Sequence, residues 1–517
     1  MRKRRIVGKR IIIVLGIICI FLIASLIGVY EALYEELKKD KEPPIIKNLK
    51  WEPTRVINDK VYDINITFSA SDDKSSIASV ELTFKPEDYN YFITKYGMRP
   101  EDYNLVFPND TRVIQLVPID GAFNSKNEEF IASIKNIIGG VEYKITVLVK
   151  DSAGNEGRVG IKTPYIREFE NLGKQLYNKG IIIMSVYLPF EMSRIPRKDD
   201  DPLLGRYDTI DNIALIKHVD WATGHGINTF ILDSQNHWWP GIKNKVFTIC
   251  EKLLSLGQIK VAWLMGPSRQ HFIYGEYGKE IPEWAIDLRT SKNNETFLMF
   301  IKELMKPELV KSENYFKIDG KSVLYIWDEG AFFNQENTYE TIKKLLMKKI
   351  GYEVYIIADW LPRIPTSPSD EYVQFLLKEY RGSGLKVVDA FTSWIGFHKV
   401  GLDTKEYVEN YEYYYDKQLD MWKHFTKEWN KDFIVSLIPG FDNSYSWGEP
   451  QIPLPRNIEK FAKRLEIAVK YLDDQQPMLK IDTWNDWGEW SYIEPTNKEK
   501  FSYLNILKSF LIKYIEG

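Results

Sequence analysis

The stretch from residue 322 to residue 328, SVLYIWD, indicates the fold of most of the chain. It is a short, continuous apolar run, which is typical of a strand buried on both faces of a parallel sheet. Seven similar runs occupy residues 180–187, 227–233, 259–265, 353–359, 386–393, 432–438 and 478–484. Helical patterns alternate with these runs, for example at residues 211–222, 339–349, 405–429, 457–472 and 501–514.

This alternation predicts an α/β domain over residues 170–517, and eight strand-helix units fit a (β/α)8 TIM barrel. A doubly wound open sheet is the alternative. The chain contains neither a G-x-G-x-x-G nor a Walker loop, so a nucleotide-binding version of that sheet has no support.

A different pattern precedes the barrel, over residues 45–166. Apolar and polar residues alternate at 62–71, 79–84, 113–117 and 142–149, and turn residues follow at 151–155. Several short strands separated by turns predict a β-sandwich. The run from 147 to 155 resembles the last hairpin of immunoglobulin-like domains of microbial surface proteins, so we expect an immunoglobulin-like β-sandwich.

The N-terminus predicts a transmembrane anchor. Residues 1–10 are rich in arginine and lysine, and residues 11–30 are uncharged and almost wholly apolar. Roughly 20 such residues span a bilayer, and the basic flank predicts a cytoplasmic N-terminus. Residues 31–44 then form a charged stalk ending in two prolines. A cleaved signal peptide is the rival interpretation, but its apolar region is usually shorter and ends in a small-residue cleavage site. The expected location is therefore the cell membrane, as a single-pass protein with an extracellular barrel.

Composition excludes several classes of protein. A formal net charge of -3 argues against a dedicated nucleic-acid binder. Two cysteines exclude a disulfide framework and a cysteine-based zinc site. The six histidines are scattered and form no H-x-x-x-H pair, so neither a catalytic metal nor a cofactor is predicted.

Carboxylates and tryptophans recur where the predicted barrel strands end. Because active sites of such barrels lie at the carboxyl ends of the strands, these residues are substrate-binding candidates. Aromatic platforms beside carboxylates fit glycoside chemistry, in which one carboxyl group transfers a proton and another attacks or stabilises the sugar. The candidates are Tyr187, Asp233, His237, Trp238, Trp239, Asp328, Asp359, Trp360, Trp394, Asp442, Trp484, Asn485, Trp487, Tyr492 and Glu494.

The most specific motif spans residues 481–495, IDTWNDWGEWSYIEP. It resembles the TWNEWxEG…IEP signature of glycoside hydrolase family 99, the endo-α-mannosidases, and of WbsX-like polysaccharide-biosynthesis proteins. Residues 317–328, 439–442 and 227–239 resemble further blocks of these families. The segment WNDWGE is also similar to the WNDxGE segment of family 71, the α-1,3-glucanases, and inspection does not separate the two.

The family 99 resemblance implies that the two carboxylates of the motif are catalytic. They fall on Asp486 and Glu489. Glu489 would be the general acid/base at the glycosidic oxygen, and Asp486 would assist at the sugar 2-hydroxyl. Asp486 is one methylene shorter than the family glutamate, which could move the carboxylate by more than about an ångström. Trp490 stands where the family has glycine, so a bulky ring lies near the acid.

Three functions are therefore expected to compete. The first is a membrane-anchored extracellular glycoside hydrolase that cleaves α-linked mannan or glucan. The second is a non-catalytic protein that binds surface glycans. The third is a WbsX-like role in polysaccharide biosynthesis, which ranks lower because an outward-facing barrel lacks access to nucleotide sugars.

Overall fold

The computed structural model describes most of the chain, in two compact units. The first unit contains the described residues up to 162, and the second contains those from 167 onward. The described residues are 16–32, 34, 40–58, 61–86, 112–138, 143–162, 167–189, 200–234, 243–267, 271–275, 283, 285–351, 353–360, 385–394, 404–444 and 452–516.

Near the N-terminus, residues 16–32 are helical. Among the described residues, no helix combines the length and the apolar character needed to cross a membrane. The expected basic tail, the first part of the anchor expected at residues 11–30, and residues 35–39 of the expected stalk lie outside the described residues.

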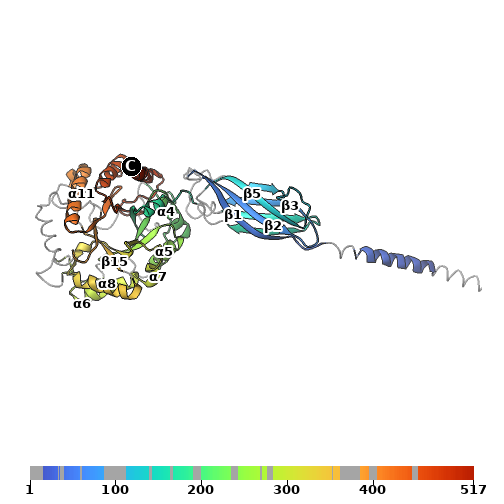
Figure 1. Cartoon of the computed structure of the whole chain (residues 1–517), viewed down its shortest axis with the longest axis horizontal. Coiled ribbons are helices and arrows are strands. Elements are labelled where there is room, and N and C mark those ends of the chain that lie inside the picture. The colour runs from blue at the N-terminus through green and yellow to red at the C-terminus, as the bar shows by residue number, and fades with distance from the viewer. Residues whose placement is uncertain are drawn as a thin grey trace, which may run out of the picture. The chain divides into compact units, whose positions relative to one another are not determined.

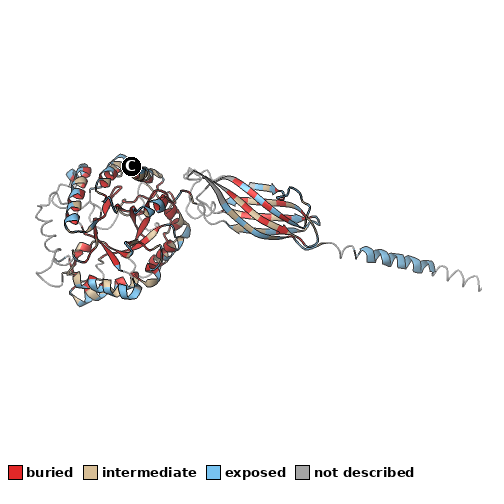
Figure 2. Ribbon diagram, in the orientation of Figure 1, coloured by how far each residue is buried: buried red, intermediate tan, exposed pale blue. Residues whose placement is uncertain are grey.

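The first unit contains two antiparallel sheets that share one hydrophobic core (Figure 2). In β6, for example, the residues alternate between buried and more exposed positions, as expected of a strand in a sheet with one face on the core and one face in solvent. One sheet has the order β1-β2-β5 and the other β4-β3-β6-β7. The strands are β1 (Ile45–Asn58), β2 (Val61–Ser71), β3 (Ile77–Pro86), β4 (Arg112–Leu116), β5 (Asn127–Ile138), β6 (Tyr143–Asp151) and β7 (Glu156–Lys162). Its assignment as immunoglobulin-like stays a prediction.

The second unit contains a parallel sheet that closes into a barrel. Its order is β17-β16-β15-β13-β10-β9-β8-β19-β18, and β17 and β18 are two parts of one interrupted strand. β17 pairs with β16 and β18 pairs with β19, so this strand joins the two ends of the sheet. The strands are β8 (Ile182–Tyr187), β9 (Thr229–Asp233), β10 (Lys260–Met265), β13 (Lys321–Ile326), β15 (Val354–Asp359), β16 (Ala390–Thr392), β17 (Asp432–Phe433), β18 (Val435–Leu437) and β19 (Met478–Ile481).

Helices surround this sheet (Figure 1). β8, β9 and β15 are buried at every position, as expected of strands covered on both faces. The helices are α3 (Leu172–Asn178), α4 (Asn212–Gly224), α5 (Lys243–Leu256), α6 (Ser291–Leu304), α7 (Pro307–Val310), α8 (Glu336–Ile350), α10 (Thr404–Glu409), α11 (Tyr411–Glu428), α12 (Ile458–Val469) and α13 (Ser502–Glu516). The short strands β11 (Ile286–Asp287), β12 (Lys317–Ile318) and β14 (Phe332–Phe333) and the 3-10 helix η4 (Glu329–Ala331) lie in the connections.

The expected barrel is confirmed, with corrections to individual elements. The helix expected at residues 405–429 is interrupted at Asn410, whose side-chain amide donates to the carbonyl of Glu406 at 3.0 Å. Asparagine offers the backbone such an alternative partner, which favours a break in a helix. The sixth strand is shorter than expected, because only residues 390–392 pair as β16.

Candidate active site

Three loops meet at the rim of the barrel, at the carboxyl ends of neighbouring strands. They follow β8, β18 and β19, which are adjacent in the sheet. The side chain of Asn485 accepts the backbone N–H of Leu188 at 2.8 Å and donates to the Leu188 carbonyl at 2.9 Å. The backbone N–H of Asp442 donates to the carbonyl of Glu489 at 2.7 Å. The loop after β19 is therefore attached to both neighbouring loops.

The loop after β19 is also closed on itself. The backbone N–H of Thr483 donates to the carbonyl of Ser491 at 2.6 Å, and that of Ile493 donates to the carbonyl of Thr483 at 2.9 Å. The hydroxyl of Thr483 accepts the backbone N–H of Asp486 at 2.7 Å. Thr483 thus holds both ends of the turn that carries the two predicted catalytic carboxylates.

Asp486 and Glu489 lie on this one turn. The Oδ1 atom of Asp486 accepts the backbone N–H of Glu489 at 2.9 Å, and Asp486 is only 6% exposed. Glu489 is half-buried at the rim. The carboxylate of Asp486 therefore fixes the backbone at Glu489, as aspartate commonly does in turns. Their catalytic roles stay predictions.

Glu494 is the centre of a buried network beneath the turn. Its Oε2 accepts the hydroxyl of Tyr207 and the indole N–H of Trp487, both at 2.8 Å, and its Oε1 lies 2.9 Å from Nε2 of His218. Nδ1 of His218 lies 2.9 Å from the hydroxyl of Tyr187. Burial, and then the charge of Glu494, raises the pKa of both tyrosines well above the usual range, so both hydroxyls are neutral.

This network fastens the loop after β19 to α4, which carries His218. Tyr187, Trp487 and Glu494 were expected to bind substrate, and all three are buried within it. The role that their contacts support is to hold the turn in place. Trp484 and Asn485 are likewise fully buried, and Tyr492 stacks on Trp487 with the ring centroids 3.7 Å apart.

A second buried network lies inside the barrel, and the sequence reasoning missed two of its members, Lys480 and Asp482. Nζ of Lys480 lies 2.8 Å from Oδ1 of Asp482, 3.0 Å from the hydroxyl of Tyr325 and 3.8 Å from Asp359. Tyr325 donates to Asp359 at 2.6 Å, and Ser436 donates to Asp482 at 2.7 Å. Burial raises the pKa of Asp482, although Lys480 opposes that shift.

A sequence signal for this network existed. Lys480 interrupts the apolar run of β19, and a lysine in a strand buried on both faces requires a buried partner. Asp359, expected to bind substrate, is committed to this network. Trp394 is half-buried beside it, with its ring centroid 5.3 Å from Nζ of Lys480.

Of the remaining predicted residues, Asp233, Asp328 and Trp360 lie at the ends of three different strands, β9, β13 and β15. Asp233 ends β9 and is 8% exposed. Asp328 follows β13 with a left-handed backbone, at φ 49°. Trp360 is packed against the rings of Phe391 and Trp429. The predicted residues His237, Trp238 and Trp239 lie outside the described residues.

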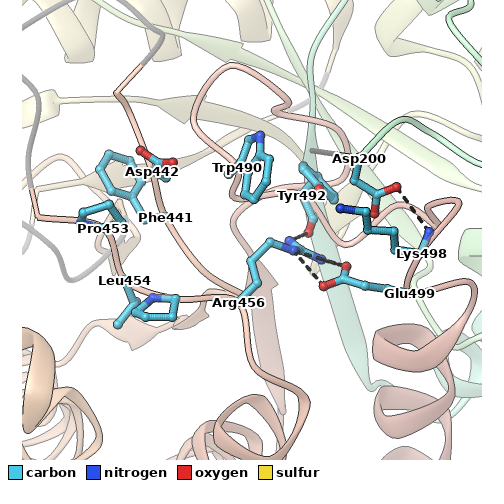
Figure 3. A pocket seen from close by; sticks show the side chains of 11 residues that line it. Asp200, Phe441, Asp442, Pro453, Leu454, Arg456, Trp490, Tyr492, Lys498 and Glu499 are labelled. Atoms are coloured by element: carbon cyan, nitrogen blue, oxygen red, sulfur yellow. Dashed lines mark hydrogen bonds and ion pairs between the residues drawn. The ribbon is translucent and has the colours of Figure 1, made fainter. Parts of the chain in front are cut away.

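A pocket of about 350 Å³ opens where the three loops meet (Figure 3). Each loop contributes to its lining, and Asp442 and Tyr492 are the predicted residues that take part. Trp490 stands between Asp442 and Tyr492 in the view of Figure 3. The lining consists of Asp200, Phe441, Asp442, Pro453, Leu454, Pro455, Arg456, Trp490, Tyr492, Lys498 and Glu499.

Among the described residues, a grouping of three carboxylates suited to a cation lies in the sandwich and not at the barrel rim. It consists of Asp40, Asp72 and Asp151, with one oxygen of each within 4.8 Å of the others. Hydrogen bonds within the turns already engage these oxygens, since Asp72 accepts from Lys74 and Ser75 and Asp151 accepts from Asn155.

The fold and the rim define a (β/α)8 barrel protein with a carboxylate-bearing turn after its last strand, at the end of the barrel where active sites of this fold lie. The family model described as "Glycosyltransferase WbsX" matches residues 191–507, more than half of the chain. The chain therefore belongs to the WbsX family, which confirms the resemblance drawn from the motif. The likeness to family 71 stays a prediction.

The chain is also similar to solved structures. A "Glycoside hydrolase-like protein" is 17% identical with a TM-score of 0.51, over 67% of this chain and 96% of that chain. The family 99 endo-α-mannosidase from Bacteroides thetaiotaomicron is 14% identical with a TM-score of 0.44, over 65% of this chain and 97% of that chain. No curated protein sequence matches the chain.

Proposed function

We propose that this protein is a glycoside hydrolase that cleaves α-linked glycans of the mannan or glucan type at the cell exterior. The observation that carries the proposal is the turn after β19, which presents Glu489 from a backbone fixed by Asp486 beside the rim pocket. Cleavage of a glycosidic bond usually requires two carboxyl groups, and this turn carries two, next to Trp490, which lines the pocket.

In this mechanism Glu489 acts at the glycosidic oxygen. It protonates the leaving group and then removes a proton from the attacking water. Asp486 assists at the neighbouring hydroxyl of the sugar, and its hydrogen bond to the Glu489 backbone keeps the two groups in a fixed relation. General acid/base catalysis of this kind contributes about 10²–10⁴-fold to a rate.

The proposed location follows from the N-terminus. The basic residues 1–10 and the apolar residues 11–30 support an uncleaved signal anchor with a cytoplasmic N-terminus and an extracellular barrel. In this proposal the sandwich is an immunoglobulin-like spacer or docking module.

The family description favours a second candidate, glycosyl transfer during surface-polysaccharide assembly. The same two carboxylates serve transfer if a sugar hydroxyl replaces water as the attacking group. A third candidate is glycan binding without catalysis. These candidates differ in their products, because only hydrolysis releases new reducing ends in water.

The test uses the full chain in a non-glycosidic detergent, incubated with α-mannans and with α-1,3- and other α-glucans. Reducing ends are quantified, and NMR follows the anomeric configuration. We expect Glu489→Gln to lower release by at least about 100-fold. Glu340→Gln, at an exposed position on α8, is the matched control and should leave the rate unchanged.

Hydrolysis that survives Glu489→Gln would contradict the assigned role. Retained configuration would favour participation of Asp486, and inversion would favour a water between the two carboxylates. Transfer to an added sugar acceptor without reducing-end release would support the second candidate. Binding without any product would support the third.

A further inference from the structure

The rim pocket contains an aromatic residue in an unusual backbone conformation. Trp490 has φ 53°, in the left-handed region that glycine adopts freely and bulky side chains seldom occupy. Such outliers persist where the surrounding structure holds them, and they cluster at ligand sites. The Trp490 side chain is half-buried and lines the pocket, so the strained backbone presents an indole ring to the opening.

The charges of the lining decide which ligand fits. Asp200, Asp442 and Glu499 carry three negative charges, and Arg456 and Lys498 carry two positive charges. The lining therefore has a net charge of -1 when these groups have their ordinary charges.

The arginine is not available to an anionic ligand. Arg456 donates from Nη2 to Glu499 at 2.6 Å and from Nη1 to the carbonyl of Tyr492 at 2.5 Å. Its guanidinium also lies 4.0 Å from the ring centroid of Tyr492. Arg456 is thus part of the wall. The other cation of the lining, Lys498, is exposed to solvent, where its charge is screened.

A carboxylate, that of Asp442, lines the same pocket as the indole ring of Trp490. An ionised carboxylate only accepts hydrogen bonds, so it suits a ligand with hydroxyl or ammonium donors and opposes an anion. The volume of about 350 Å³ is at the small end of the range for small-molecule sites, roughly 300–1,000 Å³.

We propose that this pocket is a subsite for an uncharged sugar unit of the glycan. The apolar face of the sugar stacks on Trp490, and a sugar hydroxyl donates to Asp442. Sugar units that carry a carboxylate or a phosphate are disfavoured there. The inference rests on the proposed function only in taking a glycan as the ligand, because binding to the pocket requires no bond cleavage.

A binding measurement therefore tests the proposed subsite separately from catalysis. The full chain carrying Glu489→Gln is titrated by calorimetry, in a non-glycosidic detergent, with neutral trisaccharides of α-linked mannose and of α-1,3-linked glucose. The charged probe is α-1,4-linked trigalacturonate, compared with the neutral α-1,4-linked maltotriose. Trp490→Gly, Trp490→Phe and Asp442→Asn are each added to this background, and circular dichroism verifies folding.

We expect a neutral trisaccharide to bind and Trp490→Gly to weaken it by at least about tenfold, as removal of a central aromatic anchor does. Trp490→Phe keeps a ring and should stay within about threefold, and Asp442→Asn should weaken binding by about three- to tenfold. Tyr413→Ala is the matched control, since Tyr413 is an exposed aromatic residue on α11 outside the pocket lining, and it should change nothing.

Several results would overturn the subsite. They are unchanged affinity in both Trp490→Gly and Asp442→Asn, trigalacturonate binding as tightly as maltotriose, or no binding of any neutral trisaccharide. Reducing-end release by the unmodified chain would in each case leave the proposed hydrolase standing. If the unmodified chain releases no reducing ends but a neutral trisaccharide still binds in a Trp490-dependent way, the proposed hydrolase is contradicted and the subsite is supported.

Discussion

At the scale of single residues, the carboxylates of the rim differ in their burial and in their hydrogen bonds. Asp486 accepts a backbone N–H, and Glu494 accepts from two side chains and contacts a third, while Glu489 is half-buried at the rim. Buried carboxylates are tolerated when their oxygens are hydrogen-bonded in this way. The burial of Glu494 makes the network sensitive to its replacement.

We expect Glu494→Gln to lower the free energy of unfolding of the barrel by about 1–3 kcal/mol, because a glutamine presents N–H groups where one of the carboxylate oxygens accepted. Urea denaturation followed by circular dichroism measures the change. The exposed Glu340→Gln serves as control and should stay within about 0.5 kcal/mol. Equal stability of Glu494→Gln and the unmodified chain would contradict the role given to this residue.

Asp482 predicts a pH dependence of stability. Burial raises its pKa, so the folded protein binds this proton more tightly than the unfolded chain does. The stability that it contributes is full below the ordinary pKa of about 4 and is lost as pH rises through the raised value. We expect Asp482→Asn, which cannot ionise, to lose less stability than the unmodified chain as pH rises from 4 toward 7. Parallel urea midpoints across that range would refute this expectation.

At the scale of elements, β19 connects the barrel interior to the rim. Lys480 on this strand contacts Asp482, just beyond its end, and reaches Asp359 at the end of β15 and Tyr325 on β13. The loop that follows β19 carries the turn of Asp486 and Glu489. β19 thus carries the buried charge of Lys480 inside the barrel and leads directly into the candidate site at the rim.

Lys480→Met should destabilise the barrel by about 3–5 kcal/mol, because two buried carboxylates would lose their lysine. The double variant Lys480→Met with Asp482→Asn removes one of those charges and should recover part of the loss. Thermal and urea unfolding of the single and double variants give the interaction free energy between Lys480 and Asp482. Additive losses in the double variant would show that the pair does not interact.

Most barrel elements were predictable because each strand is a local apolar run and each helix has a local period. The residues at which these elements begin and end were less predictable. Only the pairing partners decide that β16 is confined to residues 390–392 and that β17 and β18 are separate pieces of one strand. The break at Asn410 depends on a side-chain hydrogen bond that periodicity does not reveal.

At the scale of the whole molecule, the chain consists of two units with separate cores. The core of the sandwich includes Phe68 and Phe130, whose rings stack with centroids 5.0 Å apart. Because each unit buries its own apolar surface, each should unfold in its own transition.

Phe68→Ala should therefore cost the sandwich about 3–5 kcal/mol and leave the barrel transition unchanged. Differential scanning calorimetry of the full chain resolves the two transitions. Ile131→Ala, at a position 47% exposed on β5, is the control and should have little effect. A shift of both transitions by Phe68→Ala would contradict independent unfolding.

The sequence by itself determined the barrel, the alternating strands of the first unit and the loop that carries Asp486 and Glu489, because these depend on local apolar periodicity and on one contiguous motif. Only the tertiary structure decided that Glu494 and Asp359 are each buried in a hydrogen-bonded network and that Lys480 belongs to the second of these networks. It also decided that three loops enclose a pocket. The physical reason is distance along the chain. The bond between Asn485 and Leu188 joins residues 297 positions apart, and such a contact exists only once the barrel has closed.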